Sequence, residues 1–149
     1  MMSRHGVIDE IAQGCLMGRA RMLARVLTGI YDDAMRPFGI KASQLNLLVV
    51  VAQLGPIRRI DIGRTIHLDS STLTRNLQVM LANDWIEETA SAEDGRGRPL
   101  RVTAQGRALL QKLSGAWKDA QRKARKLLGT DGEAMLLDLS SGLPRPDAP

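Results

Sequence analysis

The sequence predicts a mainly α-helical domain that carries one small antiparallel β-hairpin. Apolar residues recur every three or four positions through most of the chain, which is the spacing of amphipathic helices. An alternating pattern typical of strands appears only in residues 85–103, and Gly or Pro separates the helical segments. The 149 residues, of which 44% are hydrophobic, suffice for one domain core and not for two. We therefore expect residues 1–149 to form a single domain.

The first predicted helix is long and amphipathic and covers residues 8–35. Pro37 and Gly39 end it. Its apolar stripe consists of Ile8, Ile11, Cys15, Met22, Val26, Ile30 and Ala34. The second predicted helix covers residues 43–54 and ends at the Gly-Pro dipeptide that follows. It has little polar surface, so we expect it to be more buried than the first.

Two shorter helices are predicted next, at residues 59–66 and at about 69–82. Asp69 is the expected cap of the second one, because its side chain can accept from free backbone N–H groups. Leu68 faces Leu73 as a hydrophobic staple. The tight connection between the two helices is typical of a helix-turn-helix.

A β-hairpin follows this pair of helices. Residues 85–89 and 100–103 are predicted strands, and a Gly-containing turn at 94–98 joins them. A hairpin at this place in the chain predicts the wing of a winged helix-turn-helix.

A second long helix is predicted after the hairpin, beyond Thr103. Gly129 is its expected stop. A short helix at about 133–139 and a loose tail at 143–149 follow.

The order of elements predicts a winged helix-turn-helix core at about 42–103 between two arms, at about 7–36 and 104–141. A core of this size is too small to cover the apolar stripes of two long helices. We therefore expect the arms to be dimerisation arms that hold a homodimer.

Cysteine content and hydropathy exclude several classes of protein. Cys15 is the only cysteine, which excludes an intrachain disulfide and a zinc site built from several cysteines. The longest apolar run, at 47–52, is far shorter than the roughly 20 residues of a membrane helix. Asp9 and Glu10 stand where a signal peptide would be apolar. We expect a cytoplasmic protein without a membrane partner.

The net charge of +5 favours a polyanionic partner. The predicted core at 42–103 is neutral, with seven charges of each sign, whereas residues 104–126 carry seven basic groups and one acidic group. We interpret the basic stretch as a solvated helix face, and a stripe that contacts phosphates is the alternative. The two Trp, one Tyr and one Phe are too few for a base-stacking platform, so double-stranded DNA is the expected nucleic acid.

Small hydroxyl residues and one arginine begin the helix predicted at about 69–82. Hydroxyls and backbone N–H groups at a helix start suit phosphates, and longer side chains reach base edges. The segment from Asp69 to Asn76 supplies this mixture of groups. At the predicted wing, Arg96 and Arg98 lie beside glycines that allow close approach to a minor groove. An ordinary capped surface helix and a solubilising hairpin tip are the alternative interpretations.

From about Ile8 to Leu139 the chain resembles the MarR family of bacterial transcription regulators. Three stretches carry the resemblance: the recognition helix at 68–77, the wing signature of Asp94, Gly95, Arg96, Leu100, Thr103 and Gly106, and the opening segment from Tyr31 and Asp32 to Gln44. The resemblance implies a homodimer held by the terminal helices, with recognition helices in successive major grooves and wings in minor grooves. It also implies a small-molecule effector that acts between the arms and the core. Residue by residue, it implies that DNA is contacted from the helix by Ser70, Ser71, Thr72, Thr74 and Arg75, and from the wing by Arg96.

The chain departs from the family pattern at three places. Asn83 and Asp84 stand where a glycine is usual, so a left-handed backbone there depends on the tolerance of Asn or Asp. Arg58 stands where a capping Thr is usual, and Gly63 where an Ala packs. We expect these changes to affect local stability more than function.

Cys15 lies on the apolar stripe of the first predicted helix, so we expect a buried structural cysteine. The alternative hypothesis is a redox switch, because some MarR relatives sense organic peroxides through a cysteine near this point of the first helix. Such a switch needs an accessible thiolate whose oxidation to sulfenic acid alters the dimer interface.

No arrangement typical of catalysis, of a cofactor site or of a metal site is found, and His5 and His67 are the only histidines. We therefore expect no enzyme and no cofactor. The expected function is a dimeric, sequence-specific DNA-binding transcription regulator, a repressor that a small-molecule effector releases. One alternative is a winged-helix protein-interaction module without specific DNA binding, which the neutral core favours. The other is a peroxide-sensing repressor based on Cys15.

Overall fold

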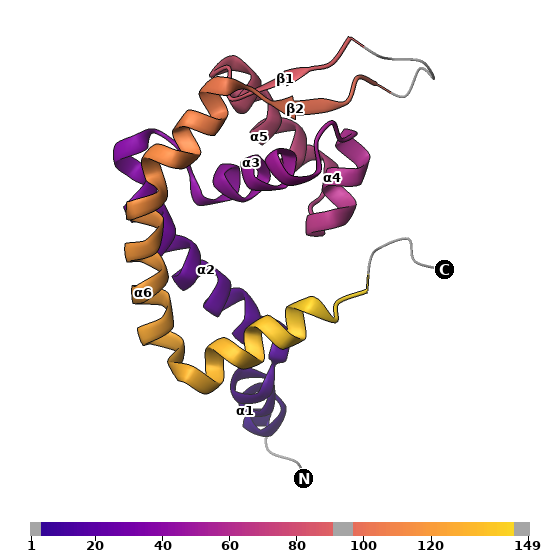
Figure 1. The fold of residues 1–149 in the computed structure, drawn as a ribbon. Coiled ribbons are helices and arrows are strands. Elements are labelled where there is room, and N and C mark those ends of the chain that lie inside the picture. Colours follow the sequence, from indigo (N-terminus) through magenta and orange to yellow (C-terminus); the bar gives the residue numbers. More distant parts are fainter. Residues whose placement is uncertain (1–3, 91–96, 145–149) are drawn as a thin grey trace.

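Short helices and a hairpin gather at one end of the molecule, and long helices run from them to the other end (Figure 1). This computed structural model describes residues 4–90 and 97–144. The elements in chain order are α1 (Arg4–Gly14), α2 (Leu16–Met35), the 3-10 helix η1 (Arg36–Phe38), α3 (Ala42–Leu54), α4 (Arg59–Ile66), α5 (Ser70–Ala82), β1 (Ile86–Glu88), β2 (Leu100–Val102) and α6 (Ala104–Ser141). The predicted fold class, mainly α-helical with one antiparallel hairpin, is confirmed.

The first arm consists of two helices, so the prediction of one continuous helix over 8–35 is wrong. The break lies at Cys15, whose extended backbone (φ −69°, ψ 106°) separates α1 from α2. Gly14 and Gly18 flank the break. Glycine destabilises a helix because its backbone loses more conformational entropy on ordering than that of other residues. The apolar stripe continues past this point, which is why the spacing of apolar residues alone does not reveal the break.

The second arm is α6, which packs along α2 and bends near its far end (Figure 1). The bend lies at Gly129, where the backbone is not helical (φ 71°, ψ 171°). A positive φ favours glycine, so the predicted stop at this residue is confirmed. The helical segment beyond it is longer than the predicted 133–139 and reaches Ser141. The ion pair between Arg125 Nε and Glu133 Oε1, at 2.7 Å, spans the bend.

The hydrophobic core lies between α3, α4, α5 and the hairpin. Its fully buried side chains include Leu47, Leu48, Ile62, Leu77, Met80 and Leu100. Met35 of α2 and Leu113 of α6 extend the same cluster toward the arms. Removing apolar surface from water contributes roughly 25 cal/mol per Å². This burial fixes the inner face of α5 and therefore the direction in which its outer face points.

The turn between α4 and α5 is tight. His67 ends α4 in a left-handed conformation (φ 54°, ψ 42°), and the N–H of Leu68 donates to the carbonyl oxygen of Gly63 at 3.0 Å. A Cβ at Gly63 would lie 3.3 Å from the Leu68 carbonyl oxygen and 3.4 Å from Cδ2 of Leu73. Glycine at this position therefore leaves α5 room to pack closely against α4.

The turn after α5 contains a second left-handed residue, Asp84, with φ 56°. The prediction that an Asn or Asp would take over the role of the usual glycine is confirmed at this residue. The hydroxyl of Thr103 donates to the Asp84 carbonyl oxygen at 2.5 Å and accepts from the N–H of Gly106 at 3.0 Å. Thr103 thus caps α6 and connects its start to the turn that leads into β1.

Candidate nucleic-acid interface

Asp69 caps the N-terminus of α5, as the sequence predicts. Its carboxylate accepts from the backbone N–H of Thr72 at 2.9 Å and from the hydroxyl of Ser71 at 2.7 Å. The Thr72 N–H bond, followed by the Ser71 hydroxyl, lowers the pKa of Asp69 to about 2. Asp69 is therefore ionised at neutral pH. Its negative charge lies at the N-terminus of α5, which is the positive end of the helix dipole.

The outer face of α5 carries four exposed polar side chains at helical spacing: Ser71, Thr74, Arg75 and Gln78. Three of them were predicted contacts, and the structure brings these three together on one face. Gln78 was missed, although its position three residues after Arg75 and four after Thr74 is a signal that identifies it. A glutamine at such a place can donate to and accept from an adenine edge.

The two remaining predicted contacts of α5, Ser70 and Thr72, are not among the four side chains of the outer face. Ser70 is exposed in the first turn, whereas Thr72 is half-buried and lies off the outer face. Thr72 Oγ1 accepts from Nη2 of Arg75 at 3.5 Å. Thr72 is thus placed to hold the arginine side chain.

Two hydroxyls of α5 already donate hydrogen bonds within the protein. The Thr74 hydroxyl donates to the carbonyl oxygen of Ser70 at 2.8 Å, and the Ser71 hydroxyl donates to Asp69. A hydroxyl has a single proton, so either group would have to rotate before it could donate to a phosphate. Arg75 is consequently the strongest donor of the outer face.

The hairpin pairs β1 with β2 in antiparallel register, Glu87 opposite Arg101, and projects beyond the helices (Figure 1). Oε1 of Glu87 lies 2.7 Å from Nε of Arg101, so this acidic side chain is neutralised by its cross-strand neighbour. Arg98 precedes β2 and is exposed. Arg96, the other predicted wing contact, lies outside the described residues.

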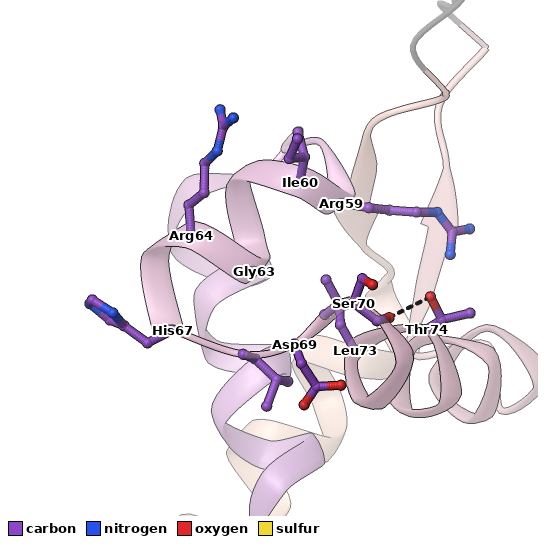
Figure 2. A pocket seen from close by; sticks show the side chains of 10 residues that line it. Arg59, Ile60, Gly63, Arg64, His67, Asp69, Ser70, Leu73 and Thr74 are labelled. Atoms are coloured by element: carbon purple, nitrogen blue, oxygen red, sulfur yellow. Dashed lines mark hydrogen bonds between the residues drawn. The ribbon is translucent and has the colours of Figure 1, made fainter. Parts of the chain in front are cut away.

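A cavity of about 610 Å³ lies beside the first turn of α5, next to α4 (Figure 2). Its lining includes Arg59, Ile60 and Arg64 from α4 and Ser70, Leu73 and Thr74 from α5. The Arg59 side chain extends toward the hairpin, above Thr74 in this view, and its Nη2 lies 2.8 Å from Oε1 of Glu88 on β1. This ion pair joins α4 to the hairpin. It connects residues 29 positions apart, so no local spacing predicts it.

A second cavity, of about 520 Å³, lies where α2, α3 and α6 meet. Its lining is mostly apolar, and the polar and aromatic groups among it include Tyr31, Ser43, Asn46 and Trp117. The Tyr31 hydroxyl donates to Oε1 of Gln121 on α6. Burial raises the pKa of Tyr31, and the nearby Arg125 partly offsets this effect.

The second cavity has one hydrogen-bonded connection to α5. The hydroxyl of Ser43, which lines the cavity from α3, donates to Oδ1 of Asn76 at 3.5 Å. The Asn76 side chain in turn donates to the Thr72 carbonyl oxygen at 3.0 Å. The wall of the cavity is therefore in direct contact with the helix that carries Arg75.

Cys15 is partly exposed and caps α2, so the predicted buried cysteine inside a helix is not observed. Its Sγ accepts from the N–H of Gly18 at 3.5 Å. Within residues 4–90 and 97–144, no three His, Cys, Asp or Glu side chains gather as a metal site would require. None of the described helices is long and apolar enough to cross a bilayer.

Sequence comparison relates the chain to bacterial regulators. The profile of the MarR family matches residues 38–97. The multiple antibiotic resistance protein MarR of Salmonella typhimurium is 26% identical over 108 residues, which are 72% of this chain and 75% of that protein. The uncharacterised HTH-type transcriptional regulator YdgJ of Bacillus subtilis is 27% identical over 90 residues, or 60% of this chain and 53% of that protein.

Solved structures agree with this relationship. The Mycobacterium tuberculosis transcriptional regulator MosR, solved in complex with DNA, is 31% identical, with a TM-score of 0.74 over 85% of this chain and 92% of that one. A MarR variant from Escherichia coli, solved with operator DNA, has the same fold, with a TM-score of 0.76, 22% identity and coverage of 91% and 98%. The chain therefore belongs to the MarR family of transcription regulators.

Proposed function

We propose that this protein is a homodimeric, sequence-specific double-stranded DNA-binding repressor that a small-molecule effector releases. The observation that carries the proposal is the outer face of α5. An apolar inner face locks this helix into the core, while Ser71, Thr74, Arg75 and Gln78 remain exposed on the outside. Recognition of bases in a major groove requires a rigid helix whose exposed face carries side chains, such as Arg and Gln, that can form two hydrogen bonds to one base.

The proposed contacts combine α5 with the wing. On α5 they are Ser70, Ser71, Thr72, Thr74 and Arg75, to which we add Gln78 because it is exposed on the same face. On the wing they are Arg98 and Arg96, which lies outside the described residues. Relatives in this family have been solved with DNA, MosR among them, and this supports the same use of the fold here.

The arms support a homodimer. Seven apolar side chains on α1 and on α2 as far as Val26 are more than 45% exposed, and so are four beyond the bend of α6. The first group is Val7, Ile8, Ile11, Leu16, Met17, Met22 and Val26, and the second is Met135, Leu137, Leu139 and Leu143. α1 and the bend of α6 lie at the end of the molecule away from the hairpin (Figure 1). Exposed apolar surface on this scale favours burial against a second copy.

The cavity between α2, α3 and α6 is the proposed effector site. It is bounded by both arms and by α3, so a ligand there would contact the arms and the core at once. Ser43 and Asn76 connect its wall to α5. In the dimer, the distance between the two α5 helices decides whether both fit the DNA. A ligand that binds more tightly to a conformation in which this distance does not fit shifts the population away from the DNA-binding state.

The proposed function is tested by selection from a random duplex library, followed by measurement of the enriched sequence against a scrambled one. Enrichment of a palindromic sequence, with half-sites about one helical turn apart, is the expected result for a dimer. Sedimentation of the free protein as a monomer would contradict the dimer.

A winged-helix protein-interaction module is the second candidate, favoured by the ion pairs that neutralise Glu87 and Glu88 and leave the hairpin stem with little net charge. Failure to enrich any sequence, with the dimer intact, would favour this candidate over the repressor.

A further inference from the structure

Arg59 lies beside the proposed DNA-binding face without belonging to the recognition helix. Its side chain is 37% exposed and pairs with Glu88, which is 39% exposed. It lines the same cavity as Ser70 and Thr74, two of the proposed contacts (Figure 2). Exposed ion pairs contribute little to stability, because water and salt screen the charges. Folding alone therefore gives no strong reason for this cation to be held at the edge of the interface.

The chemistry of the pair leaves Arg59 able to bind a second acceptor. A guanidinium has five N–H donors in a planar fork, and Glu88 accepts from Nη2. Arginine forms strong charge-assisted hydrogen bonds to phosphate. A duplex whose backbone met Ser70 and Thr74 would pass the mouth of this cavity, within the region into which Arg59 extends.

We infer that Arg59 is a further DNA-contacting residue, which binds a backbone phosphate beside the first turn of α5, and that Glu88 competes with the phosphate for it. The inference rests on the proposed function. In the free protein Glu88 holds the guanidinium toward the hairpin, and in the complex the guanidinium turns to the phosphate. The contact is independent of base identity, because phosphates carry no sequence information.

The test compares R59Q with R36Q in binding to the selected duplex, between about 50 and 200 mM salt. Arg36 is a matched control, because it forms an exposed ion pair with Asp33 at 2.7 Å and lies beyond the end of α2. R59Q is expected to weaken binding about fivefold to tenfold and to lower the salt slope by about 0.9 for each α5 bound. The loss should be equal on the selected and the scrambled duplex.

R36Q is expected to leave affinity and slope unchanged. Equal affinity and slope for R59Q and wild type, with wild type bound tightly, would overturn the inference and leave the proposed function intact. If wild type selected no duplex at all, the proposed function itself would fail.

Glu88 provides a second, independent measurement. E88Q is expected to raise affinity severalfold in the wild-type background, because it removes the competitor of the phosphate, and to raise it less in R59Q. Non-additivity of this kind indicates that the two side chains interact. Strictly additive effects would mean that Glu88 merely repels DNA, and they would contradict the exchange of Arg59 between carboxylate and phosphate.

Discussion

Gly106 lies so close to Trp85 that a Cβ on the glycine would come within 2.1 Å of the Trp85 carbonyl oxygen. The contact joins the first turn of α6 to the segment that leads into β1. Since real Cβ atoms do not approach an oxygen this closely, only glycine fits at this position. The backbone of the α6 arm is thus in close contact with the backbone of the segment that leads into the hairpin.

Gly106→Ala is predicted to destabilise the protein by about 1–3 kcal/mol, because the backbone of the hairpin or of α6 must shift to admit the methyl group. Urea unfolding followed by circular dichroism measures this change. Gly115→Ala, on the same helix, is the control, since a Cβ at Gly115 would meet nothing within 4 Å. It should stabilise by about 0.5–1 kcal/mol. Equal effects of the two substitutions would show that the close approach does not restrict residue 106.

Asp69 should make the free energy of unfolding depend on pH in the acidic range. Its pKa in the folded protein is about 2, below the value near 3.9 of an unperturbed Asp. A lowered folded pKa contributes stability that is present above pH about 4 and is lost as the pH falls toward about 2. Asp69→Asn keeps an acceptor for the Thr72 N–H but does not titrate. The difference in urea midpoint between wild type and this variant should therefore shrink as the pH falls from about 4 to about 2. A difference that stays constant over this range would contradict the lowered pKa of Asp69.

Much of the fold followed from local sequence signals. Asp69 as a cap and Gly129 as a stop were predicted from residue type alone, because both depend on backbone geometry within one turn. The break at Cys15 was not predicted, since apolar spacing continues across it. The Arg59–Glu88 and Tyr31–Gln121 contacts join segments far apart in the chain, and no local pattern encodes them. The contacts of the DNA-binding face remain predictions.

Arg75→Ala is predicted to lower operator affinity by about 1–3 kcal/mol and to relax the preference at one base pair. Gln78→Ala should have the same kind of effect at a neighbouring pair, one that contains adenine. Lys112→Ala is the control, because this exposed lysine lies on α6 and not on the recognition helix or the wing. Binding assays on all single-base variants of the operator measure both effects. Uniform weakening across sequences would instead make Arg75 a phosphate contact.

Cys15 is predicted not to control DNA binding. Its Sγ caps α2 by accepting from the N–H of Gly18 at 3.5 Å, a structural role that a serine hydroxyl can also fill. Cumene hydroperoxide should leave the operator complexes of wild type and Cys15→Ser equally stable. Release of the wild type together with retention of Cys15→Ser would establish the peroxide-sensing alternative in place of the small-molecule effector.

The central claim, that this protein reads double-stranded DNA, is tested most directly by fluorescence anisotropy with DNA from upstream of its own gene. A scrambled duplex is the control, and both are measured at about 50 and 200 mM salt. The account predicts tight binding to the upstream duplex alone, weakening steeply with salt as several phosphate contacts are lost. Equal, weak binding to both duplexes, and again to any sequence selected from a random library, would contradict it.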